Sequence, residues 1–85
     1  MTIFASDSIQ RLSKKLECRG DAAAEAQWHS EAIFEYSAAL SLGPDSPQRL
    51  FIKRSKAYMA KDLWKDALND ANAVYSFFLT QVRFC

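Results

Sequence analysis

A short sequence pattern occurs twice in this chain, at a separation of 35 residues. Glu31-Ala32-Ile33 is matched by Asp66-Ala67-Leu68. A small residue stands twelve positions before the central alanine of each segment, Gly20 in the first case and Ser55 in the second. A period of this length is typical of proteins that stack helical hairpins, because one hairpin cannot bury both of its faces alone.

Four apolar stripes with helical spacing surround the matched segments. The first begins at Ile9, with Asp7 as its expected N-cap and Gln10 completing a capping box. It runs on to Ala26 through Gly20, which costs about 1 kcal/mol relative to alanine and predicts close packing against another helix. The other three stripes are Ala32, Ile33, Tyr36, Ala39 and Leu40; Leu50, Phe51, Ser55, Tyr58 and Met59; and Leu63, Trp64, Ala67, Leu68, Ala71, Val74 and Tyr75.

Local breaking and capping signals separate these stripes. Gly43 followed by Pro44 ends the second, because glycine adopts the left-handed C-terminal conformation and proline cannot continue the helix. Ser46 and Pro47 form an N-cap and first-turn pair that opens the third. Lys61-Asp62 separates the third from the fourth.

The pattern predicts an all-α fold of two antiparallel helix-turn-helix hairpins, stacked as a short right-handed solenoid. We expect one domain over residues 1–85, with a first repeat at about 13–46 and a second at about 48–76. An apolar tail follows at 77–85. It folds back as a cap, belongs to a truncated reading frame of a longer repeat protein, or pairs with a second copy as a homodimer.

In these features the chain resembles the tetratricopeptide repeat family, whose helical hairpins carry small or aromatic residues at fixed places. The segment Arg54-Ser55-Lys56-Ala57-Tyr58 is especially similar to the second repeat of co-chaperone modules. The second repeat departs from the pattern, since Val74 replaces a small residue and no proline closes it. The matching positions are Gly20, Ala32, Tyr36, Ala39 and Pro44 in the first repeat, and Ser55, Tyr58, Ala67 and Ala71 in the second.

The resemblance implies a scaffold or adaptor that binds another protein. Family members of this kind grip the acidic tail of a chaperone with Lys and Asn side chains. At the matching places this chain has Glu17 and Asp21, with Lys53 in place of Asn. A carboxylate tail would meet two anions here, so we expect no chaperone tail to bind.

A groove with a different chemistry is expected on the first helix of each repeat. It would hold an extended segment or a helix of a partner protein. The alternative is purely structural, with Glu17 or Asp21 pairing with Lys53 across the hairpins and stabilising the fold only slightly. The expected groove residues are Lys14, Glu17, Asp21, Arg49, Ile52, Lys53 and Lys56.

Catalysis is not expected, nor is a bound cofactor or metal. The chain has no Ser/His/Asp set, phosphate-binding glycine loop or CxxC motif. His29 is the only histidine, and its nearby carboxylates do not converge on one helical face. Cys18 lies in the first stripe, which predicts a buried, inert thiol. Trp28 and Trp64 lie near the hairpin bends, where we expect them to plug the gap between helices.

A nucleic-acid-associated role is the alternative function. Its basis is a cationic cluster on the third helix, formed by Arg49, Lys53, Arg54 and Lys56. The net charge of +1 argues against general polyanion binding, which needs many phosphate-directed cations. Nearby acidic residues would also offset the field of the cluster. They are Asp45, Asp62, Asp66 and Asp70.

The segments that would direct a chain to a membrane or out of the cell are not evident. Residues 1–7 lack the basic start and long apolar run of a signal peptide. No stretch approaches the roughly 20 apolar residues of a membrane span. Cys18 and Cys85 lack the spacing of a disulfide scaffold. We expect a cytoplasmic or nuclear protein.

Overall fold

The computed structural model describes the backbone of residues 2–44 and 46–83 and the side chains of residues 8–44 and 46–76. Every regular element in these ranges is an α-helix, so the all-α prediction is confirmed. The helices are α1 (Thr2–Glu25), α2 (His29–Ser41), α3 (Gln48–Ala60) and α4 (Trp64–Arg83).

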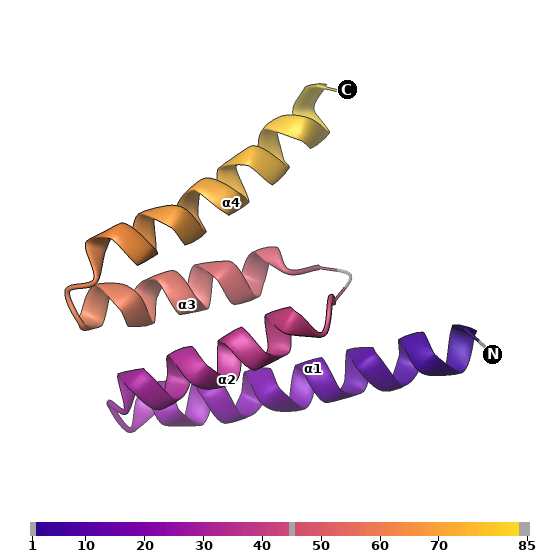
Figure 1. The fold of residues 1–85 in the computed structure, drawn as a ribbon, viewed down its shortest axis with the longest axis horizontal. Helices are drawn as coiled ribbons and strands as arrows, with labels where there is room; N and C mark the ends of the chain where they lie inside the picture. The colour runs from indigo at the N-terminus through magenta and orange to yellow at the C-terminus, as the bar shows by residue number, and fades with distance from the viewer. Residues whose placement is uncertain (1, 45, 84–85) are drawn as a thin grey trace.

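The helices stack in the order of the chain. α1 packs on α2, α2 packs on α3, and α3 packs on α4 (Figure 1). Successive helices run in opposite directions, so that α1–α2 and α3–α4 form two antiparallel hairpins. Each hairpin therefore touches only its neighbour in the chain, as in a solenoid.

Both hairpins turn with the same backbone geometry. Gln27 and Asp62, which are 35 residues apart, are the two non-glycine residues with positive φ in the described chain, at 68° and 62°. Each bend is closed by the long backbone hydrogen bond of a Schellman motif. The bonds run from Trp28 N–H to the Ala23 carbonyl (2.8 Å) and from Leu63 N–H to the Tyr58 carbonyl (2.9 Å). The 35-residue repeat found in the sequence thus extends to the backbone.

The loop between the hairpins confirms one sequence signal and corrects another. Gly43 has φ of +69° and its N–H donates to the Leu40 carbonyl at 3.1 Å, so it ends α2 as predicted. Ser46 is not the N-cap of α3. Pro47 has that position, and its carbonyl accepts from the N–H of Phe51 at 3.0 Å. No side chain caps this end of α3, and Pro47 contributes a φ of −77°, which is already helical.

The first helix starts earlier than expected. α1 begins at Thr2, so Asp7 lies within the helix and the predicted N-cap there is wrong. Residues 2–6 contain neither glycine nor proline, and nothing in them opposes a helical backbone.

The core is small and rich in alanine. Tyr36 is its one large aromatic member and lies against Gly20, where an added Cβ would come within 2.5 Å of the ring. The expected close packing at Gly20 is confirmed. The core cluster consists of Ala23, Ala32, Tyr36, Ala39, Leu50 and Ala57.

Several apolar residues that were expected inside lie at the surface. Trp28 and Trp64 are 64% and 60% exposed, so neither plugs a gap between helices. Cys18 is also exposed. The buried face of α1 instead carries Ser13, Glu17, Gly20 and Ala23, which leaves Cys18 beside it.

The fourth stripe is also mostly outside the core. Ala67 is its one buried member, whereas Leu63, Trp64, Leu68, Ala71 and Tyr75 are exposed, because no described element covers this side of α4. Met59 on α3 is exposed for the same reason. The tail does not fold back over residues 77–83, since α4 continues as one helix to Arg83. The tail's side chains lie outside the described residues.

Candidate interaction groove

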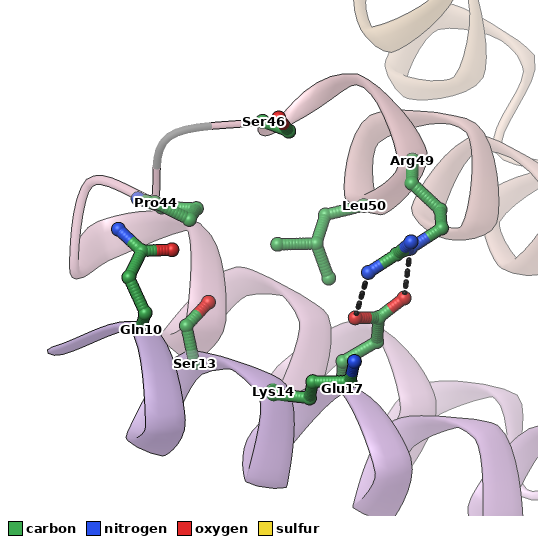
Figure 2. Close-up of a pocket in the computed structure, with 8 residues that line it drawn as sticks. All are labelled: Gln10, Ser13, Lys14, Glu17, Pro44, Ser46, Arg49 and Leu50. Carbon is green, nitrogen blue, oxygen red and sulfur yellow. Dashed lines mark hydrogen bonds and ion pairs between the residues drawn. The ribbon is translucent and has the colours of Figure 1, made fainter. Parts of the chain in front are cut away.

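Glu17 is the centre of an ion-pair network between the two hairpins. Its carboxylate accepts two hydrogen bonds from the Arg49 guanidinium, from Nε at 2.7 Å and from Nη2 at 3.1 Å (Figure 2). Lys53 Nζ donates a third at 2.7 Å. The Glu17 side chain is only 8% exposed, so three charge-assisted bonds compensate for its desolvation.

The network continues along α1 to the aromatic core. Lys53 Nζ also donates to Asp21 Oδ2 at 2.9 Å. The hydroxyl of Tyr36 donates to Asp21 Oδ1 at 2.6 Å. The Asp21 carboxylate therefore connects α3 to α2. It also holds the Tyr36 ring against Gly20 through the tyrosine hydroxyl.

These contacts shift the ionisation of the groups involved. The hydrogen bond from Arg49, supported by Lys53, lowers the pKa of Glu17 although burial opposes the shift. Burial alone would lower the pKa of Lys53, but its bonds to Glu17 and Asp21 together raise it. Burial, followed by the bond to Asp21, raises the pKa of Tyr36. Glu17, Lys53 and Tyr36 keep their ordinary charge states at neutral pH.

A hollow of about 280 Å³ lies at one end of the network, between α1 and the loop that joins the hairpins. Figure 2 shows Lys14 on its floor beside Glu17, with Pro44 and Ser46 on the loop side. Ser13 is buried here, and its hydroxyl donates to the Ala39 carbonyl at 3.3 Å. The remaining lining residues are Gln10, Arg49 and Leu50.

The structure thus brings together four of the seven expected groove residues in one network, Glu17, Asp21, Arg49 and Lys53. The other three lie around it. Lys14 shares the hollow with Glu17, and Lys56 shares a second, smaller hollow with Lys53. Ile52 is 44% exposed. The pairing that the structural alternative predicts for Glu17 and Asp21 is therefore present. The expectation that it stabilises the fold only slightly does not hold for Glu17, because that side chain is only 8% exposed.

Arg54 forms a second buried ion pair that the sequence analysis did not predict. Its guanidinium donates to both Asp70 oxygens, at 2.7 and 2.8 Å, and to the Ser37 hydroxyl at 3.0 Å. The bond to Asp70 raises the pKa of Arg54. The same group lies 5.6 Å from the ring centroids of Phe51 and Tyr58. No sequence signal distinguished Arg54 from its cationic neighbours, because its pairing with Asp70 depends on which face of α3 packs against α4.

Ion pairs neutralise most of the cationic cluster that was expected on α3. Arg49, Lys53 and Arg54 each face a carboxylate. Of the four cluster members, Lys56 alone has no ion pair within the described residues. The field available to a phosphate backbone is correspondingly small.

The described part of the chain contains neither a metal-binding cluster nor a membrane-spanning helix. No three His, Cys, Asp or Glu side chains there are placed to hold a metal ion. None of the helices in those residues combines the length and the apolar character that a membrane crossing requires.

Comparisons with protein-family models, with curated proteins and with solved structures give no significant match. The repeat itself is documented within the chain, by the matched sequence segments and the matched bends.

Proposed function

We propose that this chain is a protein–protein interaction module of the tetratricopeptide type, acting as a scaffold or adaptor. The observation that carries the proposal is the 35-residue repeat. Gln27 and Asp62 turn the two hairpins in the same way, and the hairpins stack through neighbouring helices. Proteins built in this way present extended faces that bind peptides or helices.

The proposed binding surface is the groove formed by α1 and α3. Its centre is neutralised, because Glu17 and Asp21 pair with Arg49 and Lys53. A partner would therefore be recognised at the margins of this network. The hollow beside Lys14 offers room for one side chain, and its lining is mainly polar. An extended segment that places a polar or acidic side chain beside Lys14 fits this arrangement.

Peptide selection on the intact chain tests the proposal. Peptides from a random display library would be titrated against the original chain and against Lys14→Glu, with binding followed by calorimetry. Because the charge of Lys14 is exposed, we expect reversal to weaken binding roughly two- to fivefold. Lys15→Glu is the matched control, since it makes the same charge change on the neighbouring exposed residue.

Two outcomes would count against the groove. One is that Lys14→Glu and Lys15→Glu bind the selected peptides equally well. The other is that a single-stranded RNA oligonucleotide binds instead, with an affinity that falls steeply with added salt. That result would favour the nucleic-acid alternative, because phosphate contacts release counterions.

A further inference from the structure

The side of α3–α4 that faces away from the first hairpin has the character of a helix-binding surface. In the first hairpin, Ala24, Ile33 and Leu40 pack against the core cluster to which α3 contributes Leu50 and Ala57. The residues 35 positions later are Met59, Leu68 and Tyr75, which are 49%, 59% and 62% exposed. The second hairpin thus repeats the positions that pack against this cluster, with apolar side chains and no described helix on them.

A shallow apolar hollow lies on this surface. Its volume is about 250 Å³, and Trp64, Leu68 and Ala71 line it together with Ser55, Met59 and Ala67. At the equivalent place in the first hairpin, Tyr36 stands where Ala71 stands in the second. Tyr36 lines a hollow there together with Lys53, Lys56 and Ala57 of α3. The exposed hollow therefore corresponds to a place where one helix of this chain already docks on another.

The residues at the positions equivalent to Glu17 and Asp21 indicate the chemistry of the occupant. Where the first hairpin has Glu17 and Asp21, the second has Ile52 and Lys56. Glu17 and Asp21 receive cations from α3. A helix docked in the same way on the second hairpin would face an apolar residue and a cation, so it needs an apolar and an acidic residue at those places.

A second copy of the chain, stacked head to tail, does not meet these requirements. Its α1 would take the place that α3 occupies on the first hairpin. Lys15 would then replace Leu50 against the apolar surface, and Lys14 would replace Arg49 beside Ile52 and near Lys56. Both substitutions are unfavourable, because one desolvates a lysine and the other brings two cations together.

We propose that Met59, Trp64, Leu68, Ala71 and Tyr75 form a docking surface for an amphipathic helix of a partner protein, with an acidic residue on the edge that faces Lys56. The five apolar residues of this surface are not among the groove residues, although Lys56 at its edge is. Its central hollow is lined mainly by apolar residues, as the centres of interfaces that bind a helix generally are.

Two synthetic helices serve as probes. Both have the sequence of residues 48–60, extended with alanine-rich turns to stabilise the helix. The test helix carries Arg49→Leu and Lys53→Glu, and the control helix is unchanged. Binding is followed by Trp64 fluorescence on the intact chain with Trp28→Phe, since the probes contain no tryptophan. We expect saturable binding of the test helix, roughly five- to tenfold tighter than that of the control.

Variants of the chain locate the binding. We expect Leu68→Glu to abolish it and Lys56→Glu to reverse the preference between the two probes. Leu12→Glu makes the same change at another exposed leucine and should leave binding unchanged. Circular dichroism of each variant checks that the fold is retained, which the exposure of both leucines predicts.

Three results would overturn the proposal. They are no binding of the test helix to the folded chain, equal binding by Leu68→Glu, and a concentration-dependent dimer in light scattering that Leu68→Glu disrupts. The last result would assign the surface to a second copy. Lys14→Glu should not affect the probes, so failure here and failure of the groove proposal are distinguishable.

Discussion

Gly20 and Tyr36 show how much of this fold depends on single residues. The ring lies where a Cβ at position 20 would be, and the hydroxyl of the same tyrosine is fixed by Asp21. Glycine is unfavourable in a helix, but here it admits the largest side chain of the core. The equivalent pair in the second hairpin is Ser55 and Ala71, so that hairpin needs no glycine.

Replacing Gly20 by alanine should destabilise the chain. We expect overpacking against the held ring to cost about 1–3 kcal/mol, more than the roughly 0.5–1 kcal/mol that alanine gains over glycine in a helix. Urea unfolding followed by circular dichroism measures the difference. Ser55→Ala is the matched control and should change stability little. An equally stable Gly20→Ala would show that Tyr36 moves easily.

Glu17 should make stability depend on pH in the acid range. Its pKa is lower in the folded chain than in the unfolded chain, because Arg49 and Lys53 favour the carboxylate. Its contribution is therefore complete above the unfolded pKa and is lost as the pH falls through the folded pKa. We expect Glu17→Gln to cost about 1–3 kcal/mol at pH 7 and progressively less as the pH falls through the folded pKa of Glu17.

Unfolding midpoints of both chains across this pH range test the assignment. The difference between the two chains isolates Glu17 from the other carboxylates. A difference that does not shrink on acidification would contradict the role of the ionised group. Glu25→Gln, at an exposed residue of the same helix, should leave the midpoint almost unchanged at every pH.

At the scale of the elements, the hairpin bends and the loop between them fix where the helices stop. Gln27 and Asp62 adopt a left-handed backbone conformation, in which side chains other than those of Asn and Asp are unfavourable. Gly43 adopts it without such a cost. Of these three positions, Gln27 in the first bend therefore has the least favourable backbone conformation.

Gln27→Gly should consequently stabilise the chain. We expect a gain of up to about 1 kcal/mol, which is the steric cost of the left-handed conformation offset in part by the entropy of glycine in the unfolded chain. Gly43→Ala should lose a similar amount, about 1 kcal/mol, since no neighbouring atom lies within 4 Å to add a clash. Thermal unfolding measures both, and a lower midpoint for Gln27→Gly would contradict the bend geometry.

At the scale of the whole molecule, the two ends of the stack differ in what covers them. α2 packs on both α1 and α3, whereas the main packing partner of α4 is α3. Ala67 and Asp70 are the buried residues of α4 among its described side chains. The ion pair between Asp70 and Arg54 is thus one of the few buried contacts that hold α4 on α3.

Amide hydrogen exchange should reveal this asymmetry. We expect residues 67–76 of α4 to exchange through a partial opening that leaves α2 closed, because few buried contacts hold α4. Binding of the test helix described above should slow this exchange. Equal protection of α2 and α4 in the free chain would show that the stack opens as one unit.

The sequence by itself determined the helical class, the 35-residue period and the stop at Gly43, because periodicity and backbone conformation are local properties. It also marked Gly20 as a place of close packing. It did not determine where α1 begins, since residues 2–6 carry no signal that either opens or blocks a helix.

The tertiary structure alone decided which side chains meet. The sequence placed Glu17, Asp21 and Lys53 on matching helices, but their joining to Arg49 and Tyr36 depends on how α3 lies across α1 and α2. The exposure of the fourth stripe has the same origin. An apolar stripe shows which face a helix offers for burial, and only the arrangement of the neighbouring helices decides whether that face is covered.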